Sequence, residues 1–459
     1  MQDMIKELIR KRTGLRLGVN KFNELARLIY EIHRRENVSP AKIISEKGIE
    51  DILKDETISQ PKKFYHIKEY LLKRRFPNAI GQRDFSPYLT GFRPSKANFK
   101  VKTYSGPFYP EVIFIDNSAK SLEFTERFIG NFPEARVEYI KDIKGYHKKR
   151  EVSPYDVKKR DVFITSQRWD FFKPCPCTRG VLSCNYHIFN LGFGCPYDCS
   201  YCYLQRYTNF PGIILDANVA DFLERFDSYL KKIGNRPIRI GTGEFTDSLA
   251  LDYFTEYSKI LIPFFASRNV LFELKTKSAN IKNLIGLDHQ GKTVVSWSLN
   301  PQAIIDKEEF GTASLKERLQ AAKMCRADGY RIGFHFDPII FYPDWQKDYK
   351  DVVDEMFDTI KDIAWISLGT LRFNPSLKHI IENRFPGSDI IYQELIIGPD
   401  RKMRYYSSLK VEIYKKMFAW IRERNETTPI YLCMEPRDIW RETIGDFKSG
   451  RKVEDYLIA

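Results

Sequence analysis

Apolar residues in the first 105 positions recur at helical spacing. The clearest run comprises Phe22, Leu25, Ala26, Leu28, Ile29 and Ile32. Ser39-Pro40 is a favourable helix start, because serine caps a first turn in which proline is tolerated. We therefore predict that residues 1–105 form a separate, mostly helical extension, in which no motif indicates a chemical role.

From residue 106 the pattern changes to short apolar runs that are typical of buried strands. VIFID at 112–116 and RVEYI at 136–140 flank a helical stretch around 119–131, which predicts a small α/β unit over residues 106–180. Further strands are predicted at 238–242, 270–276, 293–299, 331–339 and 364–370. Helical stretches separate most of them, and repeated strand–helix units form parallel sheets. About six units favour a partial (β/α)6 barrel over residues 181–459, rather than a closed eightfold barrel.

The charge balance adds a class of partner. The chain of 459 residues carries a formal net charge of +14, which attracts polyanions, and nucleic acid is the commonest of these. The alternative is that a basic surface only keeps the protein soluble. The charged, amphipathic start and the lack of a run of about 18 apolar residues predict no signal peptide and no membrane span. We therefore expect a cytoplasmic protein, and the sequence does not indicate its oligomeric state.

Six of the eight cysteines lie between Cys175 and Cys202. In a reducing compartment such cysteines are metal ligands or catalytic groups more often than disulfides. The segment GCPYDCSYCYLQ (194–205) contains Cys195, Cys199 and Cys202 in the spacing C-x3-C-x2-C. Three thiolates on so short a loop can bind three irons of a [4Fe–4S] cluster and leave the fourth iron open. Zinc sites usually have four ligands in C-x2-C pairs, and this spacing departs from that pattern.

Three further cysteines, Cys175, Cys177 and Cys184, lie just upstream in KPCPCTRGVLSC. They are candidates for a second cluster or metal site. They are equally compatible with small buried residues, because free cysteine is among the most buried residue types. Both readings stay open at this point.

The cysteine spacing matches the radical S-adenosylmethionine superfamily, and LGFGCPYDCSYCYLQRYTN (191–209) resembles the cluster loop of spore photoproduct lyases. The resemblance runs in the same order from Pro107 to about Trp440, and residues 1–105 lie outside it. It implies two cofactors, a [4Fe–4S] cluster and S-adenosylmethionine, and an external flavodoxin- or ferredoxin-like electron donor. It also implies the repair of a thymine–thymine adduct in DNA through a 5′-deoxyadenosyl radical.

The same resemblance suggests individual roles. Tyr203, which follows the last cluster cysteine, stands where the family uses a tyrosine in radical return. Lys277 and Ser298 fall where the family contacts S-adenosylmethionine, and Lys275 is a close competitor of Lys277. We also assign Tyr201, the aromatic residue before Cys202, to cofactor binding.

One position departs from the family. A cysteine that donates a hydrogen atom follows the second barrel strand in the family, and here Glu244 stands there, within GTGEFTDSLALD (241–252). Gly243-Glu244 resembles the glycine–acid motif that binds the methionine amino group in many radical S-adenosylmethionine enzymes. The alternative is a tight turn with a solvent-facing glutamate. Cys433, at the end of a late strand, is the first candidate for the missing donor, and Tyr203 is the second.

A hairpin is predicted in IIYQELIIGPDRKMRYYSSLK (390–410), around Gly398-Pro399-Asp400. It follows the stretch that in the resembled family precedes a DNA-contacting hairpin. Its side chains include Arg401, Lys402 and Arg404 as phosphate contacts and Tyr405 as a base-stacking residue. The alternative is an ordinary basic hairpin.

The function we predict is radical repair or modification of a thymine lesion or another base in DNA, with DNA as the partner. One alternative is a radical enzyme that acts on a substrate other than nucleic acid. The other is a nucleic-acid-binding protein with a structural cluster.

Overall fold

The computed structural model describes residues 2–91, 107–148, 160–166, 171–207, 210–234 and 236–458. The chain divides into two compact units. The helical unit comprises residues 1–100, 340–343 and 371–410, and the barrel unit comprises residues 101–339, 344–370 and 411–459. Among the described helices, none is both long and apolar enough to cross a membrane.

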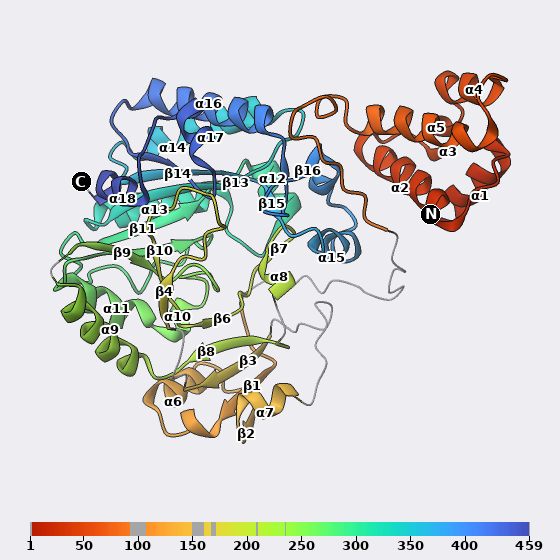
Figure 1. Cartoon of the computed structure of the whole chain (residues 1–459). Helices are drawn as coiled ribbons and strands as arrows, with labels where there is room; N and C mark the ends of the chain where they lie inside the picture. Colours follow the sequence, from red (N-terminus) through yellow and green to blue (C-terminus); the bar gives the residue numbers. More distant parts are fainter. Residues whose placement is uncertain are drawn as a thin grey trace. The chain divides into compact units, whose positions relative to one another are not determined.

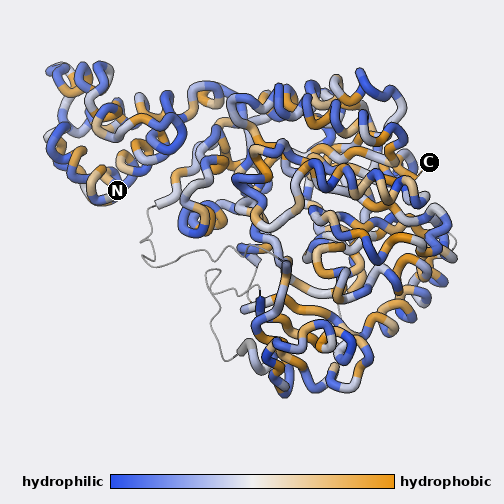
Figure 2. Tube along the Cα trace, turned by 180° about the vertical axis from the view of Figure 1, so that it is seen from behind, coloured by the Kyte–Doolittle hydropathy of each residue, from blue (hydrophilic) through white to orange (hydrophobic). Residues whose placement is uncertain are grey.

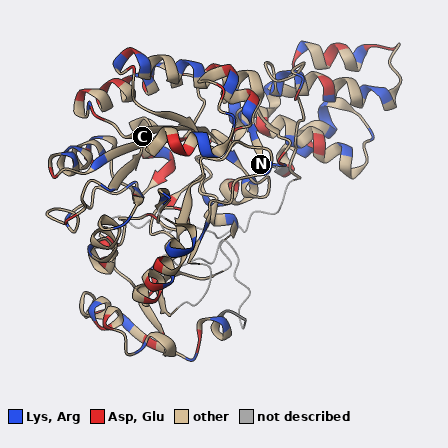
Figure 3. Ribbon diagram, turned by 60° about the vertical axis from the view of Figure 1, so that its left-hand side comes forward, with Lys and Arg blue, Asp and Glu red and all other residues tan. Residues whose placement is uncertain are grey.

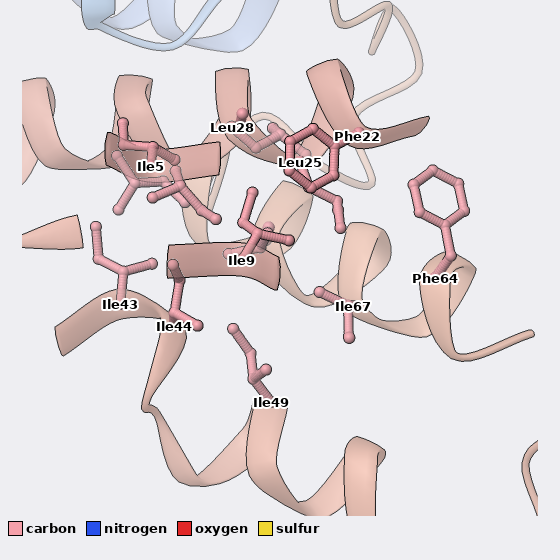
Figure 4. Close-up of a cluster of buried hydrophobic side chains, with 14 of the residues drawn as sticks. Ile5, Ile9, Phe22, Leu25, Leu28, Ile43, Ile44, Ile49, Phe64 and Ile67 are labelled. Carbon is pink, nitrogen blue, oxygen red and sulfur yellow. The ribbon is translucent and has the colours of Figure 1, made fainter. Parts of the chain in front are cut away.

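The N-terminal part of the helical unit is a small bundle (Figure 1). Its helices are α1 (Gln2–Thr13), α2 (Val19–Glu36), α3 (Pro40–Ile44), α4 (Lys47–Lys54) and α5 (Gln60–Arg75). Ile5, Ile9, Leu25, Leu28 and Ile67 are among the side chains that fill its core (Figure 4). The helical prediction is confirmed, and the Ser39 side chain caps α3 by accepting a hydrogen bond from the Lys42 N–H at 3.3 Å. The predicted boundary after residue 105 lies outside the described residues.

The C-terminal part of the helical unit contains the predicted hairpin. Its elements are β15 (Arg372–Phe373), α15 (Leu377–Arg384), the short 3-10 helix η2 (Ile390–Tyr392), β16 (Leu395–Ile397) and β17 (Met403–Tyr405). The strands β16 and β17 pair antiparallel with Ile397 opposite Met403, so the turn includes Gly398-Pro399-Asp400 as predicted. The strand β15 pairs with β17 on its other side.

The barrel unit begins with a five-stranded sheet in the order β2-β1-β3-β8-β6. Its strands are β1 (Val112–Asp116), β2 (Arg136–Ile140), β3 (Asp161–Thr165), β6 (Gly192–Phe193) and β8 (Ile213–Asp216), and η1 (Asn117–Ala119), α6 (Glu123–Gly130) and α7 (Ile143–Lys148) lie between the first three. The strands predicted at 112–116 and 136–140 are confirmed. Two strands of this sheet, β6 and β8, come after residue 180 in the chain. The sheet therefore extends past the predicted domain boundary between residues 180 and 181, and that boundary stays a prediction.

The second sheet has eight strands in the order β18-β14-β13-β11-β10-β9-β5-β4. They are β4 (Phe172–Pro174), β5 (His187–Phe189), β9 (Ile238–Gly241), β10 (Val270–Thr276), β11 (Thr293–Ser298), β13 (Arg331–Ile339), β14 (Trp365–Thr370) and β18 (Ile430–Leu432). All neighbours pair parallel except β4 with β5. The order is linear, with β4 and β18 at its two ends, so the predicted partial barrel is confirmed (Figure 1).

Helices connect and cover the strands of this sheet. They are α8 (Leu204–Tyr207), α9 (Val219–Ile233), α10 (Asp252–Thr255), α11 (Tyr257–Ala266), α12 (Gln302–Glu308), α13 (Leu315–Ala327), α14 (Trp345–Thr359), α16 (Ser407–Arg424), α17 (Arg437–Thr443) and α18 (Gly450–Ile458). Every residue of β11 and β14 is buried, as expected for strands of a parallel sheet covered by helices. Hydrophobic residues, orange in Figure 2, recur throughout the barrel unit between hydrophilic ones.

Candidate cluster and cofactor site

The cysteine loop is shaped by main-chain hydrogen bonds. The two-residue strand β7 (Asp198–Cys199) pairs antiparallel with β12 (Glu309–Phe310), which places Cys199 opposite Glu309. The Cys199 carbonyl accepts hydrogen bonds from the Cys202 N–H at 3.1 Å and from the Gln205 side chain at 3.0 Å. Residues 199–205 therefore form a closed turn that brings Cys199 and Cys202 onto one short segment.

The three thiols fit an iron–sulfur cluster by number and type. Cys199 is buried, and Cys195 and Cys202 are half-buried. Burial raises the pKa of the Cys199 thiol well above its usual value, and the Lys277 cation opposes this rise. Charges on Cys202 and Cys195 add to it, so both of these thiols lie within electrostatic reach of Cys199. Within the described residues, no three Cys, His, Asp or Glu side chains are placed to hold one metal ion. A cubane cluster takes each thiolate on a separate iron, so its ligands need not converge on one point.

A buried charge network, which no sequence motif marks, contacts the loop through Tyr201. The Tyr201 hydroxyl donates to the Glu309 carboxylate, which also accepts from Arg318 at 2.6 Å and from Asn300 at 2.8 Å. Arg318 donates further to the Ser298 carbonyl at 2.8 Å. Burial alone raises the pKa of Glu309, but the Arg318 and Lys277 cations outweigh it and hold that pKa at about 2. Glu309 is therefore ionised, and it holds the hydroxyl of Tyr201, which lies between Cys199 and Cys202 in the sequence.

Lys277 follows β10 and is half-buried beside the cluster loop. Its ammonium lies 5.5 Å from the centre of the Tyr201 ring. Burial lowers the pKa of Lys277, but the charges of Glu309 and Cys199 outweigh it, so the pKa lies above its usual value. The Asp247 carboxylate holds the backbone in place by accepting from the Lys277 N–H at 2.7 Å and from the Thr276 hydroxyl at 2.6 Å. Lys277 is thus a fixed cation next to the thiols.

The Gly243-Glu244 turn comes directly after β9. A Cβ atom on Gly243 would lie 2.8 Å from the Lys275 Cβ and 3.1 Å from its carbonyl oxygen, so only glycine fits there. The Tyr203 hydroxyl donates to the Glu244 carbonyl, and the Gly194 N–H donates to the Phe245 carbonyl at 2.9 Å. These two bonds tie the turn to both ends of the cluster loop. Glu244 itself is half-buried.

The remaining candidates for S-adenosylmethionine contacts lie on the neighbouring strands. Ser298 ends β11 and is buried, with its carbonyl accepting from Arg318. Lys275 is half-buried on β10, directly opposite Ser296 of β11, and its N–H donates to the Ser248 hydroxyl at 3.1 Å. Both residues belong to the strands that also position Lys277, so they remain candidates for the predicted cofactor contacts.

A second group of thiols lies near Glu244. The Cys175 and Cys177 thiols are hydrogen-bonded to each other. This bond and burial raise the pKa of Cys175, and the charges of Glu244 and Cys433 raise it further. Cys433 follows β18, is half-buried, and donates its N–H to the Leu368 carbonyl at 2.8 Å. Cys175 thus lies within electrostatic reach of both Glu244 and Cys433. The structure provides no assembled metal site at Cys175, Cys177 and Cys184 among the described residues.

Two of the predicted hairpin contacts are wrong for this structure. Tyr405 is fully buried, packs against Phe341 with ring centres 6.0 Å apart, and accepts a hydrogen bond from the Phe341 N–H at 2.8 Å, so its ring is not available to stack on bases. Arg404 is also buried and pairs with Asp400. Arg401 is exposed and Lys402 half-buried. The burial of all three residues of β17 and the pairing of Arg404 with Asp400 could not be predicted from charge alone.

Comparison with known proteins identifies the family. A family model described as spore photoproduct lyase matches residues 108–423. Spore photoproduct lyase of Geobacillus sp. (strain Y412MC61) is 25% identical over 302 residues, which are 63% of this chain and 86% of the relative. The Bacillus subtilis (strain 168) protein of the same name is 26% identical over 306 residues, with the same shares of both chains.

The fold agrees with solved structures. A mutant spore photoproduct lyase with bound AdoMet and dinucleoside spore photoproduct superposes with a TM-score of 0.62 at 22% identity, covering 72% of this chain and all of the other. A further structure, complexed with dinucleoside spore photoproduct, gives the same TM-score at 21% identity. The partial barrel described above is therefore the fold of these enzymes. Since the family model matches well over half of its residues, this chain belongs to the spore photoproduct lyase family of the radical S-adenosylmethionine superfamily.

Proposed function

We propose that this protein uses a [4Fe–4S] cluster and S-adenosylmethionine to repair or modify a thymine lesion, or another base, in DNA. The observation that carries the proposal is the meeting of the cysteine loop, the Gly243-Glu244 turn and Lys277 within one unit, on the fold of enzymes whose solved structures hold AdoMet and a dinucleoside spore photoproduct. A thymine adduct within a duplex has to be extruded before any such site can reach it.

In this proposal Cys195, Cys199 and Cys202 hold the cluster. As cluster ligands these thiols would be ionised, and the Lys277 cation would stabilise the thiolates of Cys199 and Cys202 electrostatically. When bound, the cluster and S-adenosylmethionine supply one-electron chemistry that yields a 5′-deoxyadenosyl radical. Glu244 pairs with the methionine ammonium, and Lys277 or Lys275 with its carboxylate. Tyr201, Gly243 and Ser298 complete the binding surface.

The hydrogen donor is assigned to Cys433, with Tyr203 as the second candidate. An O–H bond of a carboxylic acid is too strong to donate a hydrogen atom readily to a carbon radical, whereas a thiol S–H bond is weak, so Glu244 does not inherit the role. Cys175 lies within electrostatic reach of both Glu244 and Cys433, which supports a thiol donor near the Gly243-Glu244 turn. The hydrogen bond from the Tyr203 hydroxyl to the Glu244 carbonyl supports a role for Tyr203 as the second candidate.

We also propose DNA as the partner, a flavodoxin- or ferredoxin-like protein as the electron donor, and the cytoplasm as the compartment. A reducing compartment keeps the clustered thiols available for iron. Arg401 and Lys402 remain the phosphate contacts of the hairpin, because both keep solvent access while Arg404 and Tyr405 do not.

The test is an anaerobic incubation of reconstituted, reduced protein with S-adenosylmethionine and irradiated DNA, followed by mass spectrometry of the bases and of 5′-deoxyadenosine. The triple variant Cys195→Ala/Cys199→Ala/Cys202→Ala should lose iron and 5′-deoxyadenosine together, whereas Cys325→Ala, a buried cysteine of α13, should retain both. Cleavage of S-adenosylmethionine without any change in DNA would favour a substrate other than nucleic acid. DNA binding without cleavage would favour a structural cluster.

A further inference from the structure

Within the helical unit, buried charged side chains join the N-terminal helices to residues 371–410, here called the hairpin segment. Glu31 of α2 is fully buried and accepts hydrogen bonds from Arg27 at 2.7 Å, Arg75 at 2.9 Å and Lys378 of α15 at 2.6 Å. Burial raises the pKa of Glu31, but the three cations outweigh it and hold the pKa well below its usual range. Removing one member of such a group leaves uncompensated charge in the interior, which is strongly destabilising.

Further bonds join the same two segments at other points. The Glu394 carboxylate accepts from the backbone N–H groups of Asn78 at 2.9 Å and Ala79 at 2.7 Å. Arg34 donates to Asp389 at 2.8 Å, and Arg27 pairs with Glu382. The N-terminal helices and residues 371–410 therefore form one structural unit, although only the second segment lies within the matched family region.

This unit has a marked positive charge. Residues 2–91 carry 19 Lys and Arg against 12 Asp and Glu, an excess of seven, which is half of the net +14 of the whole chain. Lys and Arg, blue in Figure 3, recur along the N-terminal helices with Asp and Glu between them. Much of the electrostatic attraction for polyanions thus lies outside the part of the chain that matches the family.

A groove of about 660 Å³ lies in the same unit, where the turn between α1 and α2 meets the start of α5. It is lined by residues 14–21, Gln60 and Pro61. The charged residues of this lining are Arg16 and Lys21, and the lining contains no acidic residue. Arg16 is exposed, and a Cβ atom on Gly14 or Gly18 would meet nothing within 4 Å, so the backbone of the turn is open to a ligand.

An exposed aromatic side chain lies beside Lys21 of this groove. The Lys21 ammonium lies 4.8 Å from the centre of the Tyr65 ring and 5.0 Å from that of Phe64. Tyr65 is 57% exposed. Basic side chains, an open backbone turn and an exposed aromatic ring are the groups with which proteins contact the sugar–phosphate backbone.

We propose that the groove formed by Arg16, Lys21 and the Gly14–Gly18 turn holds the phosphate backbone of DNA, so that the N-terminal helices extend the nucleic-acid surface of the hairpin segment. This inference rests on the proposed function, because it takes DNA as the substrate. It assigns a role to the helical extension, which the family resemblance leaves without one.

The test measures binding of a fluorescent DNA duplex to the full-length protein by anisotropy across a salt series. The double variant Arg16→Ala/Lys21→Ala should lose affinity about tenfold, and the slope of log K against log[salt] should fall by about 2, since each neutralised phosphate contributes about 0.9. The matched control Lys42→Ala/Lys47→Ala removes two exposed lysines outside the groove and should bind as the parent does. Thermal unfolding checks that both variants are folded.

Three results would overturn the inference. Equal losses in both double variants would show only a general charge effect. Unchanged DNA binding, combined with weaker binding of poly-glutamate, would identify a surface for acidic protein. If the parent protein itself bound no DNA, both this inference and the proposal of DNA as substrate would be contradicted. If the parent bound DNA and the Arg16→Ala/Lys21→Ala variant bound it equally well, only this inference would be contradicted.

Discussion

At the scale of single residues, Asp216 carries a clear pH signature. It ends β8 with a fully buried carboxyl group, and neither oxygen has a hydrogen-bond partner among the described residues. Burial raises its pKa to about 8. In the unfolded chain this group ionises near pH 4, so between about pH 4 and pH 8 the folded state retains a proton that the unfolded state has lost.

The stability that neutral Asp216 contributes is therefore fully present below about pH 4 and is lost as the pH rises towards 8. We expect Asp216→Asn, which keeps the shape and cannot ionise, to remove this loss. The free energy of unfolding of the parent should fall relative to the variant by on the order of a few kcal/mol between pH 5 and pH 8. Urea unfolding at both pH values measures this, and parallel profiles would show that Asp216 stays ionised.

The proposed hydrogen donor gives a second prediction at this scale. Cys433→Ala should still cleave S-adenosylmethionine, because the cluster and its cofactor contacts are untouched, but it should lose clean turnover of the lesion and form abortive adducts. The control is Cys325→Ala, which removes a buried thiol from α13. Mass spectrometry of the DNA products compares repair by the Cys433→Ala and Cys325→Ala variants. If Cys433→Ala repairs as the parent does and Cys175→Ala does not, the donor is Cys175 instead.

At the scale of elements, the pair of short strands β7 and β12 positions the cluster loop. Glu309→Gln should leave Arg318 buried without its carboxylate and weaken the hold on Tyr201. Breaking a buried pair from one side typically costs about 3–5 kcal/mol. We expect lower thermal stability and less iron bound after reconstitution, measured as iron per chain and by the absorbance of the cluster.

The control for this element is Glu317→Gln, which changes the same chemical group on α13, next to Arg318. Glu317 belongs to the exposed capping box with Ser314, and glutamine retains an acceptor for that role. Iron content should stay at the parental level in this variant. Equal iron loss in both would mean that the effect comes from α13 as a whole and not from the Glu309 contact.

At the scale of the whole molecule, the helical unit depends on charges contributed by residues more than 300 positions apart. Glu31→Gln should destabilise the protein strongly, because Arg27, Arg75 and Lys378 would share the interior without their carboxylate. Glu69→Gln, which breaks an exposed pair with Lys73, should have no measurable effect. Thermal unfolding compares the two, and a small effect of Glu31→Gln would show that water reaches the cluster of charges.

Several features could be predicted from the sequence because they depend on neighbours along the chain. The strands at 112–116, 270–276 and 331–339 are apolar runs whose burial needs only a sheet covered by helices. The cysteine loop is also local, because eight residues contain all three thiols. The hairpin followed from its turn residues, and the partial barrel from the alternation of strands and helices.

Other features were decided by tertiary structure, because they join residues that are distant in sequence. Glu309 lies 108 positions from Tyr201 and had no motif to mark it. Arg404 and Tyr405 are buried because β15 pairs with their strand and Phe341 packs against Tyr405. These two hairpin side chains therefore serve packing and not DNA contact in this structure. The hydrogen bond from Lys378 of α15 to Glu31 of α2 joins the N-terminal helices to the hairpin segment. Local sequence determines where chemistry is available, whereas packing determines which of those groups are held together and which are covered.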